Sequence, residues 1–208
     1  MLRRVMTTPV LRQRAIPILL VVGLLSGCAV EGGGGESTAS PTPTGSPTPA
    51  PGADFYPVGV GMRWQFHTND GFTYVMEVVS EGSHQGRASF EMHSYTEGFG
   101  ASTMYHDVSG DDVWSWSEGS GSAWGLSMDL PPADSKDWTY DLGGIFFTFE
   151  WEAEPGSISV PTGVYSGCWR VHNRSTSVTN YTTYCPDIGP VYFVGGSQTG
   201  SLESVTGL

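Results

Sequence analysis

Apolar and polar side chains alternate along several short stretches of the chain after residue 54. The clearest runs are 87–93, 124–130 and 145–151. A period of two puts the apolar side chains on one face of a β-strand, so each run is predicted to be a half-buried strand. The three predicted apolar faces hold Ala88, Phe90 and Met92; Trp124, Leu126, Met128 and Leu130; and Ile145, Phe147, Phe149 and Trp151.

Turn-forming residues separate these runs. The chain has 29 Gly and 14 Pro among 208 residues, and turn clusters recur roughly every 8 to 15 residues after residue 54, a spacing typical of antiparallel hairpins. No window beyond the first 27 residues has a convincing helical period. The pattern predicts an all-β domain built on a single curved antiparallel sheet, a half-barrel or barrel of about ten strands.

The first 27 residues have the charge order of a secretory signal. Arg3, Arg4, Arg12 and Arg14 precede the apolar run 15–25. That run is too short to cross a bilayer of about 30 Å as a stable helix, and basic residues before a short apolar run are typical of a signal peptide. Residues 1–27 are therefore predicted to be a lipoprotein signal peptide that is removed on export.

Cys28 is the predicted lipidation site. The sequence Leu25-Ser26-Gly27-Cys28 resembles the lipobox of bacterial lipoproteins, in which the cysteine thiol becomes a thioether to diacylglycerol. We expect a lipoprotein held in the cell membrane or outer membrane by this diacylglyceryl anchor, palmitate being a typical acyl chain, with its folded part outside the cytoplasm. The alternative is an ordinary signal peptide followed by a free cysteine.

Residues 28–53 read as a linker between anchor and domain. They contain four consecutive glycines and then five prolines among Ser and Thr, a composition that cannot bury enough apolar surface to fold. The β domain is predicted over 54–208, which holds all 7 Trp, 9 Tyr and 9 Phe. All 21 acidic residues follow residue 30, and the whole chain carries −12, so nucleic-acid binding is excluded on charge.

Cys168 and Cys185 remain once Cys28 is assigned to the anchor. They flank a predicted hairpin that places them opposite one another. An even pair of cysteines in an exported protein favours a disulfide, and closing this loop would stabilise the fold by about 3 kcal/mol. Two unpaired buried thiols are the alternative.

Three stretches carry a family resemblance: 56–66 (YPVGVGMRWQF), 158–171 (ISVPTGVYSGCWRV) and 184–193 (YCPDIGPVYF). In this order they resemble a broad set of uncharacterised bacterial exported proteins and lipoproteins, whose domains are similar to the curved sheets of LolA/LolB or TapB-like proteins. The likeness covers about a third of the domain. It implies a fold and supplies no catalytic residues.

Candidate catalytic and metal-binding groups are few. His93 and His106 could face one another across a hairpin, but they lack the close spacing of paired metal ligands. Glu150 and Glu152 share a strand face, and Asp111 and Asp112 are adjacent, which leaves a hydrolase using Glu150 or Asp112 as a minor alternative. No metal and no cofactor is predicted, and the domain is expected not to be an enzyme.

Tryptophans supply the candidate ligand site. Trp64, Trp114, Trp116 and Trp124 are predicted to line the concave face of the sheet, where aromatic walls suit an apolar ligand or a glycan. The competing interpretation is that these rings fill the core. The preferred function is thus a non-enzymatic, membrane-anchored binding domain, and the alternative is a structural or assembly module that contacts another envelope protein.

Overall fold

The computed structural model describes residues 55–208 except 110, 118–122 and 143. The predicted signal peptide, the predicted lipidation site Cys28 and the predicted linker therefore lie outside the described residues. Over the described part the chain forms fourteen strands. They are β1 (Arg63–Thr68), β2 (Thr73–His84), β3 (Arg87–Thr96), β4 (Ala101–Ser109), β5 (Asp112–Ser117), β6 (Gly125–Asp129), β7 (Asp137–Leu142), β8 (Ile145–Ala153), β9 (Ser157–Val160), β10 (Gly163–Ser166), β11 (Trp169–Asn173), β12 (Asn180–Cys185), β13 (Gly189–Gly195) and β14 (Gln198–Thr206).

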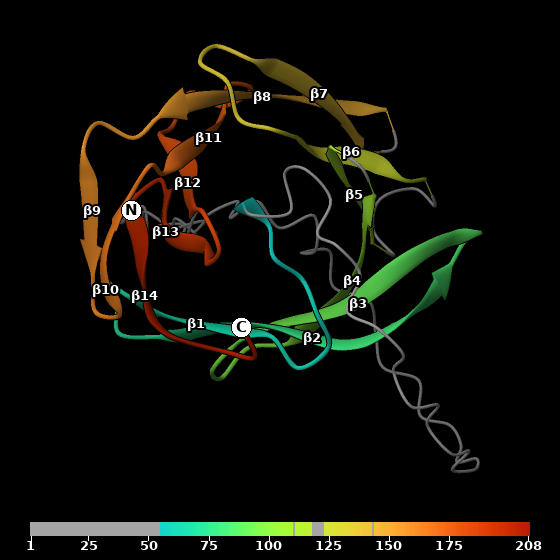
Figure 1. Ribbon diagram of the computed structural model, residues 1–208, viewed down its shortest axis with the longest axis horizontal. Helices are drawn as coiled ribbons and strands as arrows, with labels where there is room; N and C mark the ends of the chain where they lie inside the picture. The colour runs from blue at the N-terminus through green and yellow to red at the C-terminus, as the bar shows by residue number, and fades with distance from the viewer. Residues whose placement is uncertain (1–54, 110, 118–122, 143) are drawn as a thin grey trace, which may run out of the picture.

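Twelve of these strands form one sheet in the order β6-β5-β4-β3-β2-β1-β14-β13-β12-β11-β8-β7. All of its paired neighbours are antiparallel. Figure 1 shows that the sheet curls into a ring, with β7 and β8 on the side opposite β1 and β2. The all-β prediction of one curved antiparallel sheet is confirmed as a nearly closed barrel, with more strands than expected.

The ring is closed between β6 and β7 by side chains instead of a backbone ladder. The indole Nε1 of Trp138 donates to the carbonyl of Ser127 at 3.2 Å, and that of Trp151 donates to the carbonyl of Asp129 at 2.7 Å. Gly125 leaves room for a ring here, since a Cβ at this position would lie 2.5 Å from the Tyr140 side chain. Two buried tryptophans thus satisfy carbonyls that an edge strand would leave unpaired.

The alternation predicted from sequence decides which side chains fill the ring. In β8, Phe149 and Trp151 are buried in the core and Phe147 packs against it. In β3, Met92 is fully buried while Glu91 and His93 point the other way. The prediction for 124–130 was wrong in one respect. A bulge pairs Val113 with Met128 but Trp114 with Leu126, so Leu126 and Met128 face opposite sides of the sheet.

β9 and β10 form a separate hairpin between β8 and β11. Directly after it, Cys168 forms a disulfide with Cys185, with Cα atoms 4.2 Å apart, which confirms the predicted pair. Both cysteines are buried. Within the described ranges, no helix is long and apolar enough to cross a membrane.

Candidate ligand-binding groove

A bulge in β2 brings several polar residues to the outer face of the barrel. Tyr74, Met76 and Val78 point inward. The register then shifts, so that Val78 pairs with Met92 but Ser80 pairs with Glu91. A slip of one residue exchanges the two faces of a strand. The later even-numbered positions, Ser80 and His84 among them, consequently lie on the outer face.

The same outer face continues across β3, β4 and β5 as cross-strand rows. Glu91 is paired with Tyr105, and Tyr105 with Trp116. Asp107 is paired with Trp114 in the next row. Because directly opposed residues have closely spaced Cβ atoms, these rows bring polar and aromatic side chains from four strands together.

The aromatic rings on this face form one connected cluster. The His84 ring stacks on Tyr105 with centroids 3.7 Å apart and planes inclined by 10°. Its centroid is 4.2 Å from that of Trp116 and 6.4 Å from that of Trp124. We call His84, Tyr105, Trp114, Trp116 and Trp124 the outer aromatic cluster.

Arg87 joins the remaining tryptophan to this cluster. Its guanidinium carbon lies 4.6 Å from the centroid of the Trp114 ring and 5.3 Å from that of Trp124. The Arg87 Nε donates to Asp107 Oδ2 at 2.6 Å. A cation over two indole faces, fixed by a carboxylate, holds the outer aromatic cluster in place.

Three ring nitrogens of the cluster have no hydrogen-bond partner in the described chain. They are His84 Nε2, Trp116 Nε1 and Trp124 Nε1, and all three atoms are buried. An indole N–H can only donate, and leaving a buried donor unpaired costs about 1 to 3 kcal/mol. Buried donors without a partner are few in native proteins. We therefore expect water or a ligand to supply the acceptor for these indole N–H groups.

A polar groove of about 210 Å³ opens beside the cluster. We call it the outer groove. Its lining includes Ser80, Gly82, His84, Ser89, Glu91 and Tyr105. The Glu91 carboxylate accepts a hydrogen bond from Ser80 Oγ at 3.0 Å and lies 2.9 Å from His93 Nε2. The outer groove thus presents an oriented carboxylate and serine hydroxyls next to a ring stack.

The structure separates the four tryptophans predicted to share the concave face. Trp64 alone lies inside the barrel, with no exposed surface, and its Nε1 donates to the carbonyl of Ile188 at 2.7 Å. Trp114, Trp116 and Trp124 lie together on the convex outer face. The prediction that they line the concave face was wrong. Alternation along a strand shows which residues share a face, but it does not show which face points into the barrel.

The structure does not bring together His93 and His106, which were considered and disfavoured as a metal-binding pair. His93 is paired with Thr103 and bonds to Glu91 outside the barrel, whereas His106 is paired with Phe90 inside it. Glu150 and Glu152 do share a face, where Glu150 pairs with Arg174 and Glu152 with His172. Among the described residues there is no cluster of three or more metal-ligating side chains.

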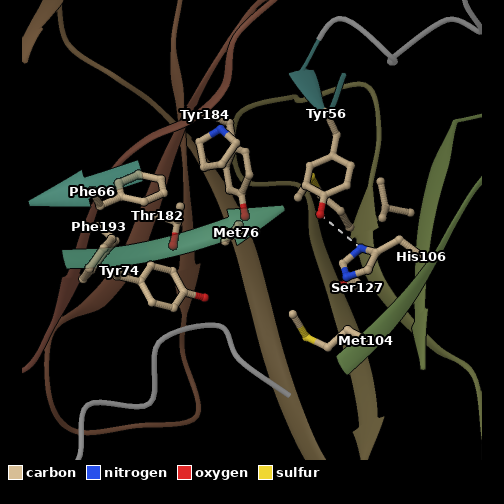
Figure 2. Close-up of a pocket in the computed structure, with 13 residues that line it drawn as sticks. Tyr56, Phe66, Tyr74, Met76, Met104, His106, Ser127, Thr182, Tyr184 and Phe193 are labelled. Atoms are coloured by element: carbon tan, nitrogen blue, oxygen red, sulfur yellow. Dashed lines mark hydrogen bonds between the residues drawn. The ribbon is translucent and has the colours of Figure 1, made fainter. Parts of the chain in front are cut away.

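The interior of the barrel holds a second, smaller cavity of about 40 Å³ (Figure 2). Aromatic and methionine side chains make up most of its wall, with Tyr56 and His106 on one side and Phe66 and Phe193 on the other. A cavity of about 10 to 15 Å³, measured in the same way, is enough for one water molecule. The interior as it stands therefore has room for water and none for an acyl chain.

Two solved structures resemble this chain. One is an inferred exported protein with a YmcC-like fold from Bacteroides fragilis, with 13% identity, a TM-score of 0.44, and coverage of 74% of this chain and 99% of that one. The other is an inferred lipoprotein from Parabacteroides distasonis, with 13% identity, a TM-score of 0.43, and coverage of 76% and 97%. No family model matches the chain, and no curated protein matches it.

Proposed function

We propose that this protein is a non-enzymatic binding domain, held outside the cytoplasm by a lipid on Cys28, and that its outer groove binds a glycan. The signal-like residues 1–27 and the lipobox at Cys28 support the location. The disulfide between Cys168 and Cys185 supports it independently, because disulfides persist in oxidising compartments.

The observation that carries the glycan assignment is the outer aromatic cluster beside a polar groove. Sugar rings offer apolar C–H faces that stack on aromatic rings, and hydroxyl groups that pair with carboxylates and hydroxyls. Tyr105 and His84 supply rings, while Glu91 and Ser80 supply polar partners. A groove of about 210 Å³ is smaller than the roughly 300 to 1,000 Å³ of pockets for drug-sized ligands, a size that suits a single sugar residue of a longer chain.

A long apolar ligand such as an acyl chain has less support than a glycan. It would need space inside the barrel, where the cavity measures about 40 Å³. A role without catalysis is supported by Glu150 and Glu152, because each is paired with a basic side chain on its own face. Neither carboxylate lines the outer groove.

Filling the outer groove tests the glycan assignment. A Cβ on Gly82 would meet nothing within 4 Å, and the residue does not need a positive φ. Gly82→Leu should therefore fold normally and occupy the groove. Gly100→Leu is the matched control, since Gly100 is equally unobstructed and lies in the β3–β4 loop.

Titration of the protein with a panel of oligosaccharides, followed by calorimetry and NMR chemical shifts, should identify a binding glycan. We expect Gly82→Leu to weaken that binding at least tenfold and Gly100→Leu to leave it unchanged, with both variants melting like the parent. Binding that Gly82→Leu leaves intact, or a panel with no binding member, would contradict the assignment.

An assembly role is the second candidate, and exposed apolar side chains at one barrel end favour it. Turns after alternate strands of an antiparallel sheet lie at the same end. The turns after β1, β3 and β11 carry Phe72, Phe99 and Val178, and β8 begins at the same end with Ile145 and Phe146. These five side chains are 38% to 67% exposed. Apolar groups gathered in this way are typical of contact surfaces.

Crosslinking in intact cells tests the assembly role. Replacing Phe99 and Phe146 together by Glu should remove a specific crosslinked partner, while Gly82→Leu should leave it in place. A partner retained by the double variant would count against this surface.

A further inference from the structure

The interior cavity has one wall residue that does not belong to the barrel. Thirteen residues line it, and twelve of them lie on β1, β2, β4, β5, β6, β12 and β13. The exception is Tyr56, which comes from the segment before β1. In Figure 1 this segment crosses the inside of the ring before the chain enters β1.

Tyr56 is held mainly through its ring and hydroxyl group. The hydroxyl lies 3.1 Å from His106 Nδ1, and the two rings stack with centroids 5.6 Å apart (Figure 2). A weak hydrogen bond from the hydroxyl reaches Met92 Sδ at 3.4 Å. The Tyr56 side chain is 3% exposed, so it occupies the barrel much as a bound phenol would.

The backbone around Tyr56 is less firmly attached than its side chain. The first backbone hydrogen bond from this segment to a barrel strand, within the described chain, joins Gly61 N to Val78 O at 2.9 Å. Phe55 and Val58 pack against the core without such bonds. Tyr56 could leave the interior without breaking any strand pairing.

His106 gives a second, independent sign of an occupant. Its Nδ1 faces the Tyr56 hydroxyl, while its Nε2 is buried and has no partner in the described part of the chain. Both nitrogens belong to a residue that is 6% exposed and lines the cavity. A buried imidazole with one unpaired nitrogen beside free space is suited to a polar group on an otherwise apolar ligand.

We infer that the barrel interior is an occluded binding site for a small apolar ring bearing one hydroxyl group, and that Tyr56 occupies this site in the free protein. The ligand ring would replace the Tyr56 ring beside His106. Met76 and Met104 also line the cavity, and their flexible side chains adapt to different shapes. An apolar cavity of about 150 Å³ holds benzene, and departure of a tyrosine ring from the present cavity creates space on that order. This site is separate from the outer groove and does not depend on it.

Phenol is the simplest probe of this site. In a titration of the full-length protein followed by NMR, phenol should shift the signals of Tyr56 and His106. It should also move the backbone signals of Phe55, Tyr56 and Val58 toward those of an unfolded chain, because it displaces the segment. Tyr56→Ala removes the internal competitor and should bind phenol at least tenfold more tightly. Tyr165→Ala, which alters a half-buried tyrosine outside the cavity, should bind like the parent.

The parent protein decides the outcome. If phenol binds Tyr56→Ala but leaves the parent signals unchanged, the substitution has merely opened a hole in the core and the inference is overturned. Water as the sole occupant of a folded Tyr56→Ala variant overturns it as well. Should that variant fail to fold, the titration of the parent still gives the answer. Gly82→Leu should not alter phenol binding, so failure here is distinct from failure of glycan binding.

Discussion

Two histidine–tyrosine stacks lie on opposite sides of the same strand. Tyr105 and His106 are adjacent on β4, yet Tyr105 stacks on His84 outside the barrel and His106 stacks on Tyr56 inside it. The outer stack borders an open polar groove of about 210 Å³, and the inner one a cavity of about 40 Å³. The same pair of residue types thus serves different environments, because consecutive side chains of a strand point to opposite faces.

Burial changes the acid–base behaviour of the inner pair. Desolvation lowers the pKa of His106 to about 4, so its imidazole is neutral at pH 7. Desolvation, with a smaller effect of Tyr184, raises the pKa of Tyr56 well above its ordinary value. The inner pair is therefore a neutral hydrogen-bonded unit. Its neutrality suits an apolar occupant better than a charged one.

The largest expected effect is on stability, and it distinguishes a tryptophan inside the barrel from one on its outer face. Trp64→Ala should lower the free energy of unfolding by about 3 to 5 kcal/mol, because it removes a fully buried ring and opens a cavity. Trp114→Ala should cost about 1 kcal/mol, mainly the loss of the Arg87 contact. Urea denaturation of both variants measures the difference. Equal losses would show that the outer aromatic cluster is part of the core.

Acidification should destabilise the fold through the inner histidine. The pKa of His106 is about 4 when folded and near 6.5 when unfolded, so between these values the unfolded chain binds a proton that the folded chain does not. Stability is therefore lost as the pH falls from 6.5 to about 4, by about 3 kcal/mol in total.

The variant His106→Gln isolates this contribution. Between pH 7 and 4 its free energy of unfolding should fall by about 3 kcal/mol less than that of the parent. Identical pH profiles for the parent and His106→Gln would show that His106 is not desolvated.

Sequence periodicity predicts the strands of this barrel better than their faces. Alternation in β3 and β8 correctly identified inward residues such as Met92 and Trp151. It failed at the bulge opposite Val113, which puts Leu126 and Met128 on different faces. A second bulge, after Val78, turns His84 outward in a strand for which no face was predicted. A bulge exchanges the two faces without leaving a clear mark in the pattern of apolar residues.

The candidate sites were predicted only in part. Trp114, Trp116 and Trp124 are near one another in the sequence, and in the structure they lie together on the outer face. Trp64 could not be separated from them, since an indole in an alternating run suits a core as well as a groove. The contact of Tyr56 with His106 spans 50 positions. It depends on a segment outside the strands, for which periodicity carries no information.

The smallest expected change in stability follows from removing a single hydroxyl group, that of Tyr56. Tyr56→Phe should lower the free energy of unfolding by about 1 to 2 kcal/mol, because it leaves His106 Nδ1 buried without its partner. Tyr192→Phe, on the outer face of β13, should cost less than about 0.5 kcal/mol. Combining Tyr56→Phe with His106→Gln should cost less than the sum of the single variants, since both remove the same hydrogen bond. Strict additivity in this cycle would mean that the inner stack is held by packing alone, and a hydroxyl on a displacing ligand would then bring no advantage over a plain ring.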